Sequence, residues 1–427
     1  MNRLTRRSAL AAVGAGIGGA LAGCSGLRSS EATVEYDESA IRELPGELPR
    51  VPATIPVQPS EAHLAAARER VRSLLDGGDV SAVPNGVVRE TLAAERDAAR
   101  GALSQDRDGE RRADAVAGLT HPRSEAMFVS AGLAAFEDEL TAADVRERRE
   151  RHHRDAATFL DDYRYAGPSD DPVAALAEHA TITRWARTGA RLTEPAERDE
   201  YENTVLHVAE LAQGVEWGRA YAADARRLHE RYVSTLDDPN DHGERFASVA
   251  DTLVDDVDPY TAPPDWDALG TDIERDIADT AAEKLLEELA SMRWSSAQHT
   301  VAQREAGSFA GAIVTGTRSV AADRAFAAAT AAIADGEYET PASIDPIAAE
   351  RAAAVDGLRA LLDSSPVLLA RRLARAVRSP IRMADENAQQ GGVTEPGRSL
   401  YAEYAVANRL AAAAPAVVER VGSAVTE

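Results

Sequence analysis

Apolar residues recur along most of the chain at steps of three and four, the period of a helix with one buried face. Between residues 60 and 76, Leu64, Val71 and Leu75 share such a face, Ser60 can cap the first turn, and two glycines follow the last. The same reasoning predicts helices over 85–103, 125–140, 141–165 and 246–257, and others starting at 171 and near 195, the latter the longest in the chain. No convincing alternation of period two appears. The pattern therefore predicts an all-α fold, an irregular multi-helix bundle or helical array.

A proline-rich stretch at 258–270 is the best candidate for an internal boundary. It would connect a first helical region, 60–257, to a second, 271–427, unless the two form one continuous domain. Thr271 and Glu274 have the spacing of a capping box, so a helix is expected to begin there. Further helices are expected to begin at 345, 365 and 396, with kinks at prolines 380 and 415.

Five prolines lie between residues 45 and 59. Proline at this density disfavours helix and favours extended polyproline conformation, so residues 24–59 are predicted to form a tether in front of the helical body. The alternative is that part of this segment, residues 51–57, packs along the surface of the body.

The first 23 residues have the character of an export signal. Thr5-Arg6-Arg7 precedes a weakly apolar stretch rich in glycine and alanine, which is too short to span a membrane. The segment resembles a twin-arginine signal peptide, with Ala9 where that consensus favours phenylalanine. The resemblance implies that the chain is exported already folded.

The signal ends in Leu21-Ala22-Gly23, directly before Cys24, and this sequence resembles a lipobox. Cys24 is the only cysteine of the chain, so neither a disulfide within one copy nor a cysteine metal site is possible. The resemblance implies lipid attachment to Cys24. The predicted location is the extracytoplasmic face of the cell membrane, with the membrane as a partner through that lipid.

The charge balance is strongly acidic, with 71 Asp and Glu against 47 Lys and Arg and a formal charge of −24. The signal carries three arginines and no acidic residue, so removing it takes the charge from −24 to −27. Lys284 is the only lysine. Acidity combined with lysine avoidance resembles proteins of extreme halophiles of the haloarchaeal type, although an ordinary acidic protein is the alternative. So much negative charge argues against nucleic acid as a partner.

One spacing in the body is compatible with metal binding. His207 and Glu210 are three residues apart within the long helix predicted near 195–236. This step is similar to the His-x-x-Glu core of imelysin-like proteins, all-α exported proteins associated with iron uptake, although Val205 stands where their motif has glycine. The resemblance implies a metal-handling role. The alternative is that His207 lies at the edge of the core.

No cofactor motif and no catalytic constellation can be recognised in the sequence. The sequence therefore favours a binding or scaffold protein at the cell envelope, with a possible envelope protein as its partner, over an enzyme. A metal-handling helical lipoprotein is the alternative function.

Overall fold

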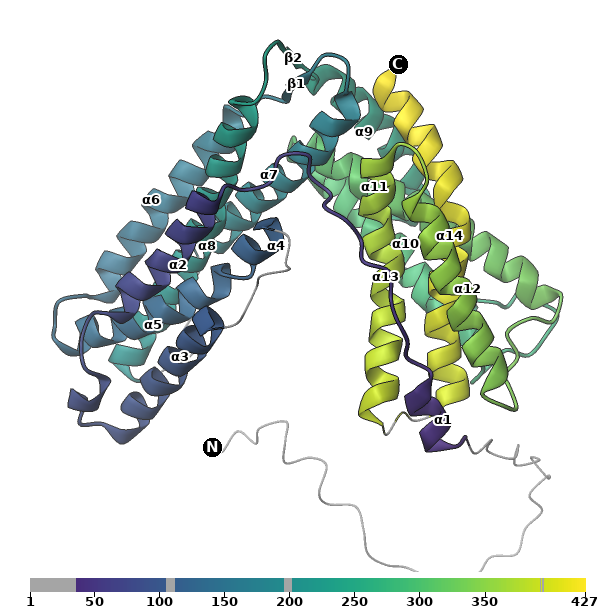
Figure 1. Cartoon of the computed structure of the whole chain (residues 1–427), viewed down its shortest axis with the longest axis horizontal. Helices are drawn as coiled ribbons and strands as arrows, with labels where there is room; N and C mark the ends of the chain where they lie inside the picture. The colour runs from purple at the N-terminus through teal and green to yellow at the C-terminus, as the bar shows by residue number, and fades with distance from the viewer. Residues whose placement is uncertain (1–35, 105–111, 196–201, 392, 394) are drawn as a thin grey trace, which may run out of the picture. The chain divides into compact units, whose positions relative to one another are not determined.

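The computed structural model describes residues 36–104, 112–195, 202–391, 393 and 395–427, and residues 36–427 form one compact unit. The predicted all-α fold is confirmed (Figure 1). The helices are α1 (Glu38–Glu43), α2 (Glu61–Leu75), α3 (Gly86–Ser104), α4 (Arg112–Ala117), α5 (Thr120–Phe136), α6 (Ala142–Asp161), α7 (Pro172–Leu192), α8 (Thr204–Val233), α9 (Gly243–Val257), α10 (Ala281–Glu305), α11 (Phe309–Ala334), α12 (Asp345–Leu362), α13 (Val367–Gln390) and α14 (Pro396–Thr426). Three short 3-10 turns cover Val80–Ala82, Asp258–Tyr260 and Trp266–Ala268, and strands β1 (Ala166–Pro168) and β2 (Pro239–Asp241) form an antiparallel pair.

Several helix starts follow from side chains that cap the first turn. The Ser60 hydroxyl accepts a hydrogen bond from the His63 N–H, and Thr141 forms a complete capping box with Asp144. The Asp171 side chain caps α7 in front of Pro172. These starts were predicted from the sequence, and they are confirmed.

The start of α10 differs from the prediction. The turn at Thr271 does not open a helix, and α10 begins ten residues later, where the Thr280 hydroxyl accepts from the Glu283 N–H. Ile273 belongs to a core cluster although it lies in a turn, and Asp279 has a left-handed backbone with φ of 60°. The apolar spacing after 271 therefore arises from a packed irregular segment.

Two helix lengths also differ from the prediction. The N-cap of α8 is Asn203 rather than a residue near 195, and residues 196–201 lie outside the described ranges. At 31 residues α14 is longer than α8, which has 30.

Helices α2 to α8 pack mainly on one another, with α8 in contact with α5, α6 and α7. Helices α7 and α8 approach each other closely at two glycines. A Cβ atom on Gly189 would lie 2.8 Å from the Gly218 carbonyl oxygen, and one on Gly218 would lie 2.8 Å from the Gly189 carbonyl oxygen. Only glycine allows the two backbones to come this close.

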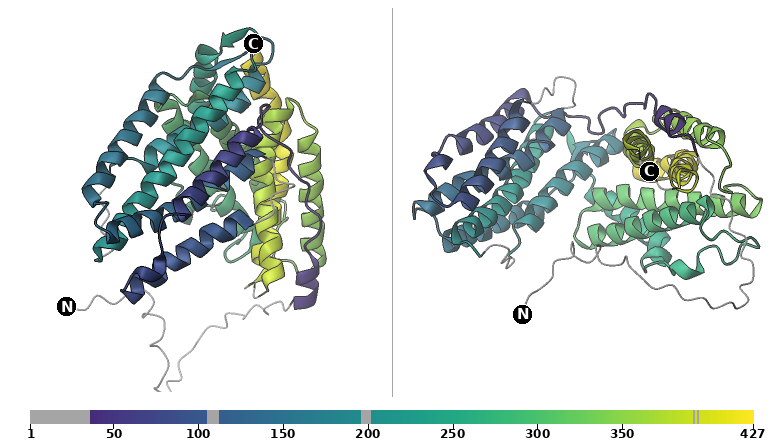
Figure 2. Two further views of the ribbon diagram at one scale, coloured as in Figure 1. Left: turned by 60° about the vertical axis from the view of Figure 1, so that its left-hand side comes forward. Right: turned by 90° about the horizontal axis from the view of Figure 1, so that it is seen from below.

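Helices α9 to α14 form the second group, in which α10 pairs with α11 and α14 contacts α10, α11, α12 and α13. Figure 2 shows α13 and α14 side by side, near the C-terminus. Since α9 packs on α10 and α11, it belongs to this group. The change of packing partners therefore lies before α9 rather than at 258–270, and residues 36–427 form a single compact unit, in agreement with the one-domain alternative. Helix α7 joins them through contacts with α11, α13 and α14.

The proline-rich segment before α2 packs on the body. Val51 and Ile55 are buried, and Val51 belongs to the largest core cluster. Arginines of the body donate to its backbone carbonyls, Arg378 to Pro49 and Arg231 to Gln58. Figure 1 shows this segment in dark purple, running along α13. The predicted tether of 24–59 is therefore too long, because residues 36–59 are part of the folded body.

None of the helices in the described ranges combines the length and the apolar character that a membrane span requires.

Candidate functional site

A cavity of about 520 Å³ lies between α10, α11, α13 and α14. Its volume falls within the ~300–1,000 Å³ of typical small-molecule sites. Each helix contributes side chains at helical spacing, such as Glu288 and Met292 on α10 and Glu403 and Val406 on α14. The complete lining is Glu288, Met292, Val314, Thr315, Thr317, Arg318, Leu369, Arg372, Leu373, Arg375, Ala376, Ser379, Pro380, Met383, Glu403 and Val406.

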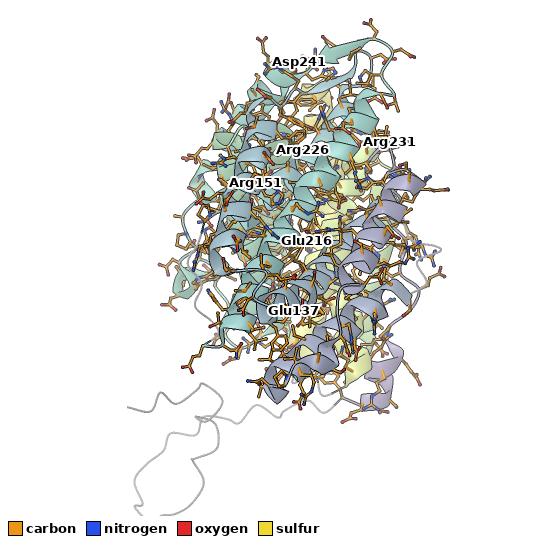
Figure 3. The ribbon with its side chains drawn as sticks, turned by 90° about the vertical axis from the view of Figure 1, so that its left-hand side faces the viewer. Glu137, Arg151, Glu216, Arg226, Arg231 and Asp241 are labelled. Atoms are coloured by element: carbon orange, nitrogen blue, oxygen red, sulfur yellow. The ribbon has the colours of Figure 1, made fainter. Side chains whose placement is uncertain are left out.

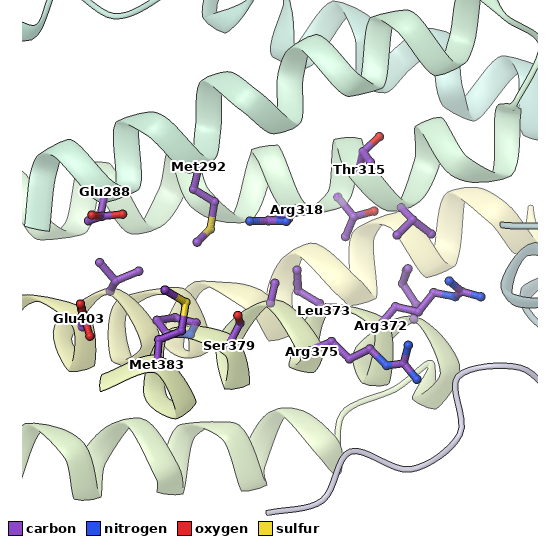
Figure 4. Close-up of a pocket in the computed structure, with 16 residues that line it drawn as sticks. Glu288, Met292, Thr315, Arg318, Arg372, Leu373, Arg375, Ser379, Met383 and Glu403 are labelled. Carbon is purple, nitrogen blue, oxygen red and sulfur yellow. The ribbon is translucent and has the colours of Figure 1, made fainter. Parts of the chain in front are cut away.

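The cavity has two chemically different ends (Figure 4). Glu288 and Glu403 lie at one end, and Arg372 and Arg375 lie at the other. Arg318 lies between them, close to the apolar side chains of the walls. A ligand in this cavity would therefore meet apolar walls and charges of opposite sign.

Arg318 is the cationic group without a counter-charge. Among the described residues it makes no ion pair or hydrogen bond, and its Nε is buried without a partner. Burial lowers its pKa. A guanidinium remains charged even so, and a partly desolvated charge without a partner costs free energy.

The two other arginines of the cavity have partners. Arg372 donates to the Thr181 hydroxyl at 2.7 Å and to the Ala177 carbonyl, and so connects α13 to α7. Burial and the charges of Arg184 and Arg375 lower the pKa of Arg372 to about 9. Arg375 lies 3.6 Å from Asp114.

The acidic end is largely neutralised. Glu288 pairs with Lys284 at 2.8 Å. Burial and the nearby charge of Glu288 raise the pKa of Glu403 to about 7, so near neutral pH both the protonated and the ionised carboxyl occur. Glu403 can therefore donate a hydrogen bond to a ligand as well as accept one.

Proline inside α13 changes the hydrogen bonding of the helix beside the cavity. Pro380 has no N–H, so the carbonyl oxygen of Ala376 lacks its usual helical donor. Both residues line the cavity, as does Ser379 between them on the helix. The arrangement can bind and orient a ligand that has an apolar body and a polar group.

The described part of the chain brings no further ligands to the predicted metal pair. His207 and Glu210 are half-buried on α8, and the His207 Nδ1 is buried without a hydrogen-bond partner. No group of three or more His, Cys, Asp or Glu side chains that could hold a metal ion occurs in these ranges. The pair thus stays a prediction without support from its surroundings.

The predicted export and lipidation residues, Arg6, Arg7, Leu21, Ala22, Gly23 and Cys24, lie outside the described residues.

A second cluster of charges is buried in the first helical group. Asp224 on α8 accepts from His63 at 2.8 Å and from both terminal nitrogens of Arg123, at 3.3 and 2.5 Å. Burial raises the pKa of Asp224, but the hydrogen bond from His63 and the charge of Arg123 outweigh it and lower the pKa overall. Glu216 lies two turns earlier on α8 (Figure 3), and its carboxylate accepts from Arg70 and Arg219. Both oxygens of each carboxylate already accept hydrogen bonds, so neither Asp224 nor Glu216 is available to a ligand. The two clusters connect α8 to neighbouring helices, and we assign them a structural role.

Sequence reasoning missed the cavity residues, since they come from four helices spread from residue 288 to residue 406. One signal was available. Arg318 is the only charged residue between 309 and 322, in an otherwise apolar and small-residue helix, and such a charge needs a partner or water.

Two family models match the chain. Residues 62–238 match a family described as "Domain of unknown function (DUF8262)", and residues 243–423 match one described as "Domain of unknown function (DUF8264)". The two matches meet at β2, before α9, where the helix packing also changes. No curated protein and no solved structure matches the chain significantly.

Proposed function

We propose that this is a lipid-anchored protein of the extracytoplasmic membrane face whose helical body binds a small molecule between α10, α11, α13 and α14. The observation that carries the binding role is the cavity of about 520 Å³, which is lined by apolar groups and by a guanidinium without a partner. Small-molecule sites combine these two features. The proposed location is supported by the twin-arginine pattern and by Cys24 after Leu-Ala-Gly.

A neutral probe tests whether the cavity binds anything. We expect 1-octanol to bind in a saturable manner with one site per chain, as measured by isothermal titration calorimetry. Ala376→Phe should abolish this binding because the added ring fills the cavity, whereas Ala328→Phe on the exposed face of α11 should leave it intact. Equal binding to the wild type and to both variants would place the probe elsewhere and contradict the proposal.

The anchor has its own test. Cys24→Ser should release the protein into the medium or leave an unprocessed precursor, as followed by cell fractionation and immunoblotting. If this variant stays in the membrane at its mature size, lipid attachment at Cys24 is wrong.

A metal-handling role is the second candidate, and only the His207 and Glu210 pair favours it. Elemental analysis of the purified protein would support it if stoichiometric metal were lost in His207→Ala. If this substitution leaves the metal content unchanged, the metal-handling role of this pair is contradicted.

A further inference from the structure

Arg318 lies in a chain that offers it many possible partners. Acidic residues outnumber basic ones by 71 to 47, and most arginines described near the cavity interact with a carboxylate or a carbonyl. Arg318 lines the cavity with no such partner in the described ranges. A partner supplied from outside would therefore compensate its charge.

The geometry of a guanidinium restricts what that partner can be. Its planar set of N–H donors matches the oxygens of a carboxylate or a phosphate, with which it forms paired hydrogen bonds. A neutral hydroxyl or amide leaves the charge uncompensated. A cationic head would be repelled by Arg318, and Glu288 at the opposite end is already paired with Lys284.

The rest of the cavity requires an apolar body. Met292, Leu373 and Met383 surround the space next to Arg318, and Met383 is half-exposed at its border. Methionine adapts its shape to ligands of different outline. A cavity of about 520 Å³ has the size of a site for one drug-sized ligand rather than for a lipid with two long chains.

We propose that the cavity binds a small amphiphile with a single oxyanion head, a carboxylate or a phosphate monoester. The head pairs with the guanidinium of Arg318, and the apolar body lies against Met292, Leu373 and Met383. This inference rests on the proposed function, since it names the class of ligand for the same cavity.

Four probes with the same eight-carbon chain separate the possible heads: octanoate, octyl phosphate, 1-octanol and octylamine. Titration calorimetry with the full-length protein in molar salt is suitable, because the Debye length is then about 3 Å and exposed charges contribute little. We expect the better of the two anions to bind about 10- to 100-fold more tightly than 1-octanol. Comparison of the two anions distinguishes a carboxylate from a phosphate ligand.

Variants of α11 assign the effect to one side chain. Arg318→Met should remove the advantage of the anion and leave 1-octanol binding within about twofold, because methionine retains the apolar stem without the charge. Arg318→Lys should keep part of the advantage, because it retains the charge without the paired donors. Arg324→Met, an exposed arginine on the same helix, is the matched control and should bind like the wild type.

The outcomes separate the inference from the function on which it rests. If 1-octanol binds but octanoate and octyl phosphate bind no more tightly, or octylamine binds best, the ligand class is wrong and the cavity remains a binding site. If the advantage of the anion survives in Arg318→Met, the assignment to Arg318 is overturned. If no probe binds, the proposed function itself fails.

Discussion

The charge cluster around Asp224 allows a quantitative prediction of stability. The exposed fractions of Asp224, Arg123 and His63 are 0%, 3% and 6%, so the ion pair is out of reach of solvent. Asp224→Asn keeps the shape of the side chain and removes its charge, which leaves the Arg123 guanidinium buried without an anion. Removing one partner of a buried pair costs about 3–5 kcal/mol.

This cost converts into a measurable change in melting temperature. For a compact unit of residues 36–427, 1 kcal/mol corresponds to about 1 °C, so Asp224→Asn should lower the Tm by about 3–6 °C. Circular dichroism during heating at pH 7 provides the measurement. Asp256→Asn is the matched control, because Asp256 forms a 2.8 Å pair with Arg420 in which both side chains are a third or more exposed. Exposed pairs contribute about 0–1 kcal/mol.

The effect of pH provides a second check on the same pair. The lowered pKa of Asp224 means that its contribution is fully present above the unfolded value of about 3.9 and is lost as pH falls through the folded value. The Tm difference between the wild type and Asp224→Asn should therefore shrink below about pH 4. A difference at pH 7 no larger than that of Asp256→Asn would refute the reasoning.

Three further predictions concern packing and ionisation. Ile55→Ala should cost about 2–4 kcal/mol in urea unfolding, because Ile55 is buried against the body, and no loss would show that this segment is detached. Gly218→Ala should destabilise by about 1–3 kcal/mol in the same assay, since its Cβ would lie 2.8 Å from the Gly189 carbonyl oxygen, whereas Gly214→Ala should be neutral or stabilising. Burial raises the pKa of Glu178 to about 7, against about 4.3 unfolded, so the free energy of unfolding should fall as pH rises between these values. Glu178→Gln should remove most of that fall, and an unchanged pH profile of the urea midpoint would contradict this.

The sequence predicted helices well where a local signal determines their ends. Ser60, Thr141 and Asp171 each satisfy N–H groups of the first turn through their own side chains, so a few neighbouring residues suffice. The start of α10 was wrong because two candidate caps, at Thr271 and Thr280, compete. Tertiary packing of Ile273 decides between them, and the local pattern carries no information about it.

The candidate site was predictable only in part. The lone charge of Arg318 could be recognised in the sequence, but its position opposite Met383 and Glu403 depends on how α11 packs on α13 and α14. The packing of the proline-rich segment could not be predicted for the same reason, because it depends on residues that are distant in the sequence. Its carbonyl groups meet Arg351, Arg371 and Arg378, which lie about 300 residues further along the chain.

The most direct test of the central claim is a crystal structure of the protein grown with octanoate. The account predicts electron density for the ligand between α10, α11, α13 and α14, with its carboxylate on the guanidinium of Arg318 and its chain along Met292 and Leu373. A cavity filled only by water, or a ligand whose carboxylate lies at Glu403 and away from Arg318, would contradict it.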